Sequence, residues 1–582
     1  SMRNLARPAA VAAVALVTGC PVEQAADDYF SKWGDSASAS STGSSGGPGS
    51  TGPSPTTGST PTTSGEASSG ASSSSGAVDA STGPDDTSTS TSGIGPLPID
   101  QPPEILAFTV AGAMQDVSIF TPGPVALHLE CVDDDGVQTI EFFRDGEPLA
   151  VGEPGTGLGE WVVHSHAFDG ASQISARCTD TAGQAVETEL PISVVVALPE
   201  PGSLLLVGTP PVTKGASEAT AVAFDAETSD LWVSGYQDAA IGGTSILLQR
   251  YNMKGELVSD TPIPFGKDVI GVAQGVAVLR DHGVVLVGCA TKPNELPRAW
   301  FARYDAAGKQ VWQQDGAPGE CGLAVAVDED LASAYVAGQQ IVGAQNLDAV
   351  LRRLHLDGGG QQGIKILDGG DNGLDAAVAV AVEPSGDVYF GGTISSMGNF
   401  RAFIRRSSPN LNQVWFAMSP IAKPAQDGLG ALTVARDGAV LSTGWHRASA
   451  LEKSRVFLRR HSPTDGSIDG LNTIEAGFQN GDNAGHAVAT TVDDEPFVAA
   501  TVTPDVNTEP NVWMKLYNSK YSPPGTWPIE FKGLAGRRDE PRGAAVGPWG
   551  HVAVAGFESV WKLDAMNKPV LRRQAWVWVL YP

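Results

Sequence analysis

Five aspartates stand close before short apolar runs that are well separated along the chain: Asp371, Asp375, Asp427, Asp482 and Asp539. Carboxylates brought together from separate segments bind a cation or accept hydrogen bonds from sugar hydroxyls. Asp is also a residue that turns require, so turn formation alone explains the same pattern. The sequence offers these five side chains as candidate ligand contacts, with a purely structural role as the alternative.

Basic residues recur once per repeat over a long part of the chain, at Arg250, Arg303, Arg353, Arg406 and Arg460. A row of arginines can bind a polyanion. However, 37 basic residues against 65 acidic ones give a net charge of −28 at pH 7, which opposes binding to nucleic acid or to anionic lipid headgroups. We therefore predict that each arginine forms a structural ion pair with an acidic neighbour.

These side chains belong to a repeat that starts near residue 200. An alternating apolar segment with small residues occurs seven times, ending at Asp225, Arg280, Asp328, Glu383, Arg436, Asp493 and Pro548, at intervals of 48 to 57 residues. A turn follows each segment, then a second strand usually ending in glycine, a third with a basic residue and a fourth often marked by tryptophan. Four short strands per unit at this period are typical of a β-propeller. We predict an all-β fold with seven four-stranded blades over residues 198–582.

The repeat also resembles a known family. Ala379–Val382, the turn Pro384–Gly386 and the strand end Phe390-Gly391 follow the pattern of the SBBP-type β-propeller repeat of secreted bacterial proteins. The resemblance extends over some 380 residues. It implies a propeller and little chemistry, because members of that family are mostly uncharacterised surface proteins.

The two ends of the repeat region predict how the propeller closes. Ser203–Gly208 has the pattern of a fourth strand, although it precedes the first unit. Ala575–Tyr581 has the pattern of a third strand, and no fourth follows it. We expect these two segments to pair in one blade, because pairing removes two exposed sheet edges.

Residues 101–197 read as a smaller domain of short strands. The segment Asp134–Gly146 resembles the D-x-D-G and E-F-x-x-D-G pattern of bacterial immunoglobulin-like domains. That resemblance implies a β-sandwich with an inter-sheet disulfide between Cys131 and Cys178. Asp133–Asp135 has two interpretations that the sequence leaves open, a calcium site and an ordinary Asp-Gly turn.

Two further cysteines, Cys289 and Cys321, lie near the end of one second strand and the start of the next first strand. Both positions face the same rim of adjacent blades, so we consider them a disulfide pair, with buried free thiols as the alternative. The cysteines show no C-x-x-C spacing, so we expect no zinc.

The N-terminus has the features of a targeting segment. Arg3 and Arg7 precede the apolar run Ala9–Val17, which is too short to span a bilayer. The following Val17-Thr-Gly-Cys20 resembles the bacterial lipobox, which implies that Cys20 is acylated; an ordinary cleaved signal is the alternative. Residues 21–100, rich in Ser, Thr, Gly and Pro, are expected to form a disordered linker. An outer-membrane lipoprotein follows from this interpretation.

Little in the sequence favours catalysis. The nine histidines are scattered, and neither a G-x-S-x-G elbow nor a phosphate-binding glycine loop is present. Tyr304–Trp312 resembles one repeat of pyrroloquinoline-quinone dehydrogenases, which carry that motif in most blades. We therefore expect a non-catalytic monomeric platform for proteins or glycans, with no catalytic residue, cofactor or metal. The alternatives are a quinone-dependent or sugar-active propeller enzyme and a passive surface coat.

Overall fold

The structure is a computed structural model, and no α-helix occurs in the part of the chain that it describes. It describes residues 100–164, 168–200, 202–208, 215–239, 242–342, 346–370, 373–396, 399–419, 425–449, 452–474, 481–504, 508–518, 527–533, 537–563 and 568–581. No apolar helix of membrane-spanning length occurs within these ranges. The expected signal peptide, its Cys20 and the linker to residue 99 lie outside the described residues.

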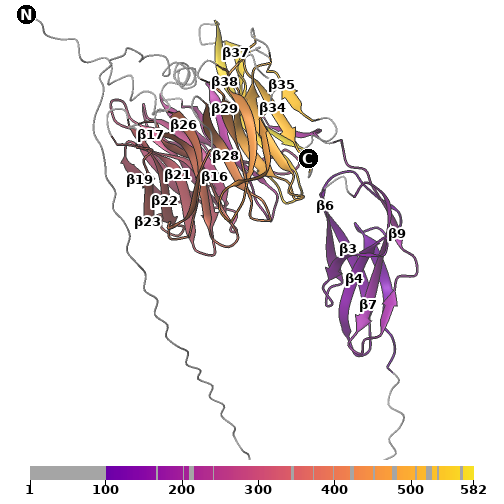
Figure 1. Cartoon of the computed structure of the whole chain (residues 1–582). Coiled ribbons are helices and arrows are strands. Elements are labelled where there is room, and N and C mark those ends of the chain that lie inside the picture. The colour runs from indigo at the N-terminus through magenta and orange to yellow at the C-terminus, as the bar shows by residue number, and fades with distance from the viewer. Residues whose placement is uncertain are drawn as a thin grey trace, which may run out of the picture. The chain divides into compact units, whose positions relative to one another are not determined.

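The C-terminal region is a β-propeller, in agreement with the spacing of the repeat. Its described strands form seven sheets, coloured from magenta to yellow in Figure 1, and the first strand of each sheet contacts the first strands of its neighbours. These strands are β11 (Ser217–Phe224), β16 (Ile270–Val278), β20 (Glu320–Asp328), β24 (Ala376–Val382), β28 (Gln426–Val434), β32 (Ala484–Thr490) and β36 (Glu540–Val546). Each contacts the next in this order, and β36 contacts β11, so the series closes.

The first three strands of each sheet follow one another antiparallel in chain order, and in six sheets the fourth strand continues this order. The second strands are β12 (Leu231–Asp238), β17 (Val284–Thr291), β21 (Ser333–Ile341), β25 (Val388–Ser396), β29 (Val440–Arg447), β33 (Pro496–Val502) and β37 (Val552–Leu563). The third strands are β13 (Thr244–Tyr251), β18 (Arg298–Tyr304), β22 (Leu347–His355), β26 (Asn399–Ser407), β30 (Arg455–His461), β34 (Asn511–Leu516) and β38 (Pro569–Leu580). The fourth strands are β14 (Leu257–Asp260) with the short β15 (Ile263–Pro264), β19 (Gln310–Pro318), β23 (Gln361–Leu367), β27 (Gln413–Met418), β31 (Ile468–Ile474) and β35 (Ile529–Phe531).

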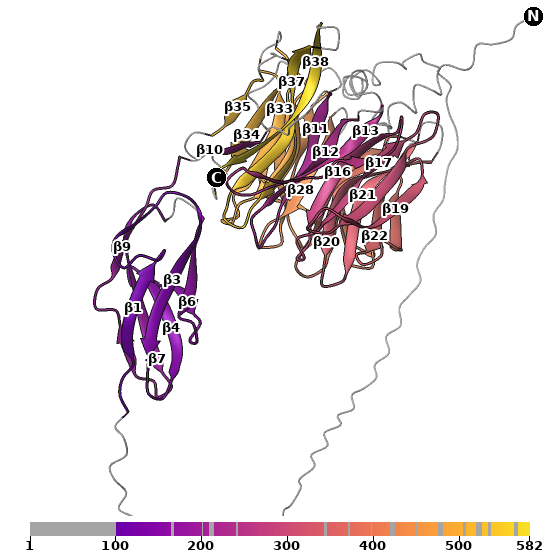
Figure 2. The ribbon, with the colours of Figure 1, turned by 180° about the vertical axis from the view of Figure 1, so that it is seen from behind.

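One fourth strand comes from the start of the region. Strand β10 (Leu204–Gly208) pairs antiparallel with β38, with Leu204 opposite Leu580 and Gly208 opposite Val577 (Figure 2). Strand β38 pairs with β37 along its other edge. The predicted pairing of the two ends is therefore confirmed, and Val577–Leu580 of β38 has a paired strand on both sides.

The second strands continue past the glycine at which they were expected to end, as β12 does beyond Gly235. The glycine itself has a steric reason. Every first strand contains a register shift, as between Ala219 and Ala221 in β11. The shift brings the carbonyl of Glu218 over Gly235, where a Cβ would lie 1.9 Å from that oxygen. A side chain at Gly235 would displace the first strand, so glycine permits the close approach of the two strands.

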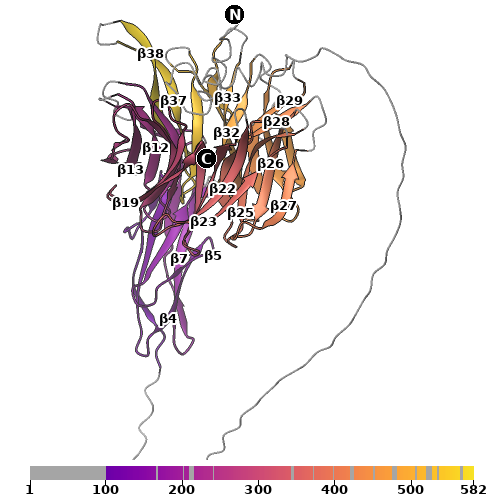
Figure 3. The ribbon, with the colours of Figure 1, turned by 90° about the vertical axis from the view of Figure 1, so that its left-hand side faces the viewer.

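Large side chains fill the space between neighbouring sheets, and small ones occupy the crowded first strands. The fully buried tryptophans Trp232, Trp300, Trp513 and Trp576 belong to second and third strands. The disulfide Cys289–Cys321 joins β17 to β20 of the adjacent sheet, as the positions of the two cysteines indicated. Figure 3 shows the sheets from another side.

Residues 102–200 form two smaller sheets. One contains β1 (Glu104–Val110), β3 (Gly123–Val132) and β6 (Leu158–Val163). The other contains β2 (Val117–Ile119), β9 (Ile192–Val196), β7 (Gly170–Asp180), β4 (Val137–Arg144) and β5 (Glu147–Gly152), with β8 (Ala185–Glu187) beside β7. A single core that includes Leu127, Phe142 and Trp161 lies between them. The expected disulfide Cys131–Cys178 joins the two sheets through β3 and β7.

Candidate functional site

The recurring arginines lie at the end of the propeller where first and second strands are joined by a turn. Their ion pairs are Arg250–Asp230 at 2.7 Å, Arg303–Asp281 at 2.7 Å, Arg406–Asp387 at 2.8 Å and Arg460–Asp437. The fifth recurring arginine, Arg353, has Ser333 in the place of the acid, and its Nε donates to Oγ of Ser333 at 2.9 Å. The prediction of structural ion pairs is therefore confirmed for four of the five arginines.

The same arginines join neighbouring sheets. Nη1 of Arg406 donates to the carbonyl of Pro463 in the next sheet at 2.6 Å, and Nε1 of Trp415 donates to that oxygen at 2.9 Å. Arg303 and Trp312 share the carbonyl of Leu356 in the same way, at 3.2 and 2.6 Å. We call this side of the propeller, defined by the five arginines and their partners, the arginine end. Its repeated side chains support the fold.

The first strands begin at the opposite side, where an equivalent position is polar and buried in six of the seven sheets. The six side chains are 0–2% exposed, and they are Ser217, Glu320, Asp375, Asp427, Asn483 and Asp539. Three of the five aspartates proposed as ligand contacts therefore occupy one repeated position. Of the other two, Asp371 lies outside the described residues.

Asp375 and Asp539 hold the backbone that leads into their strands. Oδ2 of Asp375 accepts the N–H of Gly369 at 2.5 Å, and Oδ1 accepts that of Ser395 at 2.6 Å. Asp539 repeats the arrangement on another sheet, at 2.6 and 3.0 Å. Burial raises the pKa of both carboxyls to about 6, although the backbone donors act in the opposite direction. Both oxygens of each side chain are thus used within the fold.

Asp427 lies among three side-chain donors. Its carboxylate is 2.5 Å from Nδ1 of His446, accepts Nη1 of Arg459 at 2.6 Å and accepts the hydroxyl of Ser419. Burial alone would raise the pKa of Asp427, but His446 and Arg459 outweigh it and lower the pKa. The carboxylate of Asp427 lies between Ser419 and His446. In a catalytic triad the histidine lies between the serine and the carboxylate, because it accepts the proton of the serine hydroxyl. This cluster is therefore a buried anchor.

Asp482 differs from the others because its side chain is 39% exposed. Its Oδ1 accepts Nη2 of Arg447 at 3.0 Å and the N–H of Ser454 at 3.1 Å, and Nζ of Lys453 lies 3.3 Å from Oδ2. Burial opposes ionisation, yet the Ser454 N–H and the two cations outweigh it and lower the pKa of Asp482. Asp482 is therefore an anion at the rim of a cavity.

That cavity has a volume of about 440 Å³ and opens among three neighbouring sheets. Its walls come from β24–β25, β28–β29, β32–β33 and the segment before β36. The lining residues that carry polar or aromatic groups are Thr393, Trp445, Arg447, Ser454, Asp482, His486, Thr501, Thr503 and Arg538. Apolar atoms of Val378 and Leu429 complete it. We call this side of the propeller, defined by the cavity, the pocket end.

Arg447 is the most informative residue of the pocket end. It is 7% exposed, and its Nε is buried without a hydrogen-bond partner. A buried donor that lacks a partner costs about 1–3 kcal/mol, more for a charged group. A ligand in the cavity that accepts this hydrogen bond would remove the cost.

Charges beside the cavity are balanced by a second arginine–glutamate cluster. Glu540, which is fully buried, lies 2.8 Å from Nη2 of Arg538 and 2.6 Å from Nη1 of Arg542. Burial would raise the pKa of Glu540, but the two arginines lower it. Nε2 of His486 lies 2.8 Å from the hydroxyl of Thr501. Burial lowers the pKa of His486 to about 4, so its ring is neutral at neutral pH.

A second cavity, of about 550 Å³, opens at the arginine end and is lined mainly by the turns between first and second strands. Glu383 lines it, but that carboxylate is bound to Nη2 of Arg406 at 3.1 Å. The pocket end therefore provides the better ligand site, since it contains an unpaired buried donor.

Sequence reasoning missed Arg447 and Arg538 because each occurs once, outside the repeat pattern. A weak signal exists at the residue after the glycine position of each second strand. This residue changes from sheet to sheet, and the seven residues are Tyr236, Cys289, Gln339, Thr393, Trp445, Thr501 and Phe557. Positions that vary within a regular repeat are not needed for the packing of every sheet, so their side chains can form a site.

No protein-family model and no curated protein sequence matches the chain. Among solved structures, it is similar to a protein of unknown function from Bacteroides thetaiotaomicron, with 13% identity, 82% of this chain and 98% of that chain covered, and a TM-score of 0.35. A quinohemoprotein alcohol dehydrogenase from Comamonas testosteroni has 12% identity, coverage of 71% and 73%, and a TM-score of 0.37. A europium-containing methanol dehydrogenase has 10% identity, coverage of 82% and 93%, and a TM-score of 0.36. Similarities this low carry no argument about activity.

Proposed function

We propose that the chain is a lipoprotein of the bacterial cell envelope, anchored in the outer membrane through Cys20, whose propeller is a non-catalytic binding platform. In this proposal residues 21–100 are a disordered tether and residues 101–197 an immunoglobulin-like spacer. Residues 198–582 form seven blades that present the pocket end to a glycan. The lipobox-like segment and the composition of the linker support the anchoring, and the closed series of sheets supports the platform.

The unpaired Nε of buried Arg447 is the observation that carries the choice of ligand. A guanidinium binds a carboxylate through directed, charge-assisted hydrogen bonds. Trp445 adds an aromatic surface to the same cavity, and the hydroxyls of Thr393 and Thr503 add groups that can pair with sugar hydroxyls. An acidic saccharide combines all three properties.

Titration calorimetry with the full chain tests this proposal, using an oligogalacturonate and a neutral galacto-oligosaccharide of equal length. We expect the acidic saccharide to bind and the neutral one to bind at least tenfold more weakly. Arg447→Gln should weaken binding of the acidic saccharide by tenfold or more, which corresponds to a loss of about 1.4 kcal/mol in binding free energy.

Arg436→Gln is the matched control, because Arg436 is exposed at the other end of the propeller and the change in charge is the same. It should leave binding unchanged. The proposal is wrong if the acidic saccharide gives no heat, or if both variants bind as the unchanged chain does. Binding of the acidic and neutral saccharides with equal affinity would also overturn the role of Arg447.

A further inference from the structure

Two aspartates from separate turns meet at one end of the two-sheet region formed by residues 102–200. Asp135 lies in the turn between β3 and β4, and Asp180 ends β7. A carboxylate oxygen of Asp135 lies within 4.8 Å of one of Asp180, and oxygens of Asp133, Asp134 and Asp135 lie within 4.8 Å of one another. Like charges at such distances repel, and a bound cation would relieve this repulsion.

Asp180 gives a second and independent indication of a ligand. It is fully buried; its Oδ1 accepts the N–H of Gln184 at 2.7 Å, while its Oδ2 is buried without a hydrogen-bond partner. Among the residues that the structure describes, no arginine, lysine or histidine forms an ion pair with Asp180. An ionised carboxylate buried in this way is costly unless it is paired or bound to a metal.

Turn formation explains only part of the cluster. Oδ2 of Asp133 accepts the N–H groups of Asp135 and Gly136 at 3.0 and 3.1 Å, which is the expected Asp-Gly turn. Its Oδ1 is also without a partner. The turn gives no reason for Asp180 to approach from another segment.

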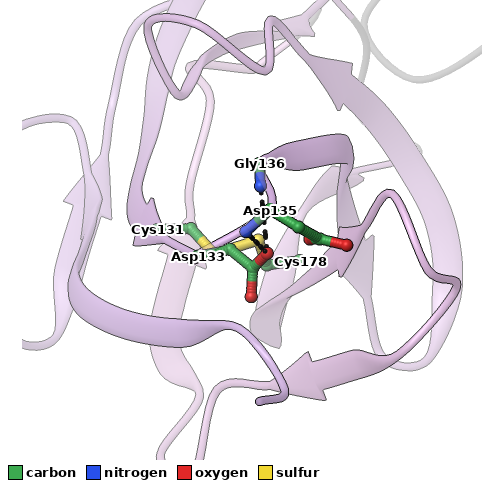
Figure 4. Close-up of a disulfide and its surroundings, with 5 residues drawn as sticks. All are labelled: Cys131, Asp133, Asp135, Gly136 and Cys178. Carbon is green, nitrogen blue, oxygen red and sulfur yellow. Dashed lines mark hydrogen bonds between the residues drawn. A yellow bond between two sulfur atoms is a disulfide. The ribbon is translucent and has the colours of Figure 1, made fainter. Parts of the chain in front are cut away.

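The disulfide fixes the two turns beside each other. Asp133 follows Cys131 by two residues and Asp180 follows Cys178 by two residues, and the Cα atoms of the cysteines are 6.6 Å apart (Figure 4). The N–H of Thr181 also donates to the carbonyl of Gly136 at 3.0 Å. The carboxylates are therefore held in place by the fold before any ion binds.

We propose that Asp135 and Asp180 bind a calcium ion, with Asp133 as a further oxygen donor in the adjoining turn. Calcium takes six to eight oxygens at about 2.3–2.6 Å, so its ligands lie up to about 5 Å apart. The oxygens of Asp135 and Asp180 lie within 4.8 Å of each other and so meet this limit. Magnesium requires a smaller and more regular octahedron, usually with several waters, so we expect weaker binding of magnesium.

Titration calorimetry of the full chain, freed of metal with a chelator, tests the proposal with CaCl₂ and with MgCl₂. We expect one site of submillimolar affinity for calcium and at least tenfold weaker binding of magnesium. Asp180→Asn should weaken calcium binding by tenfold or more, since the amide can still accept the hydrogen bond from Gln184. Asp135→Asn provides a second variant at an exposed position.

Asp116→Asn is the matched control, because Asp116 is exposed, lies outside the cluster and loses the same charge. It should bind calcium as the unchanged chain does. Circular dichroism of each metal-free variant establishes that it is folded. Absence of calcium binding to the unchanged chain would overturn the proposal, as would equal binding by folded Asp180→Asn and Asp135→Asn.

Discussion

The two ends of the propeller use arginine in different ways. At the arginine end, Arg303, Arg406 and Arg460 pair with an acid of their own sheet, and the first two also donate to a carbonyl of the next sheet. At the pocket end, Arg447 occurs once, lines a cavity and keeps a buried Nε–H without a partner. The buried Nε of Arg303 also lacks a partner, but Arg303 lines neither of the two cavities. A contact that every pair of sheets needs must appear in every repeat, whereas a ligand needs its contacts only once. Repetition therefore marks the framework, and single occurrence marks the candidate site.

The seam between the last and first sheets is an exception to this division. Glu218 of β11 accepts Nε of Arg542 at 2.7 Å and Nη1 of Arg573 at 3.0 Å, although these residues are far apart in the chain. They occur once because the propeller is closed only once. Single occurrence can thus also mark a structural element that has no counterpart in the other sheets.

Removal of Leu204–Gly208 should have the largest effect, because β38 would become an exposed edge. We expect loss of the cooperative thermal transition and increased light scattering. Deletion of five residues from the linker, such as 60–64, is the control and should change neither. An unchanged transition after removal of β10 would contradict the assignment of the seam to the framework.

Glu218→Gln should have the next largest effect on stability, because it removes the negative charge that Arg542 and Arg573 share in a buried cluster. The free energy of unfolding should fall by about 3 kcal/mol in urea denaturation. Glu227→Gln is the control, because the Glu227 side chain is 79% exposed. A loss below about 1 kcal/mol would show that the seam needs no ion pair.

Arg406→Gln tests one repeated contact of the arginine end. It removes ion pairs to Asp387 and Glu383 and the hydrogen bond to Pro463, all of them partly buried. We expect a decrease of about 2 kcal/mol in the free energy of unfolding and no change in saccharide binding. If the variant were as stable as the unchanged chain, the repeated arginines would not contribute to the stability of the propeller.

Acid should produce a smaller effect through buried histidines at both ends. Burial lowers the pKa of His461, at the arginine end, and of His486, at the pocket end, to about 4. Because these pKa values lie below the unfolded value of about 6.5, their contribution to stability is present above pH 6.5 and lost as the pH falls toward 4. Asp375 and Asp539, with pKa values near 6, act in the opposite direction between about pH 4 and 6.

His461→Gln isolates this contribution. Its free energy of unfolding should decrease by about 2 kcal/mol less than that of the unchanged chain between pH 7 and pH 5. Urea denaturation at the two pH values measures the difference. An identical pH dependence in both proteins would mean that the pKa of His461 is the same in the folded and unfolded states.

The framework could be predicted from the sequence because the same steric and hydrogen-bonding requirements recur in each sheet. Glycines such as Gly235 stand opposite the register shift of the first strand in six of the seven sheets, and Arg406 and Trp415 reach the same carbonyl that their counterparts reach elsewhere. Seven copies make such weak patterns visible. The closure by β10 followed from one unmatched strand at each end.

The candidate site was less predictable. Asp375, Asp427 and Asp539 precede apolar runs in the way that ligand contacts do, but their oxygens accept hydrogen bonds from the fold itself. A sequence shows that a carboxylate enters a loop, but it does not show how many N–H groups surround it. Arg447 could not be found because its importance depends on contacts among three sheets.

Parallel measurement of stability and saccharide binding for Arg406→Gln and Arg447→Gln tests the division between the two ends most directly. Both variants lose one arginine from the same propeller. We predict that Arg406→Gln lowers the free energy of unfolding by about 2 kcal/mol and binds the oligogalacturonate normally. Arg447→Gln should lower the free energy of unfolding by about 1 kcal/mol or less, because the lost bond to Asp482 is offset by removal of the unpartnered Nε, and should lose at least tenfold in affinity. The opposite pattern, or the same pattern for both variants, would contradict the account.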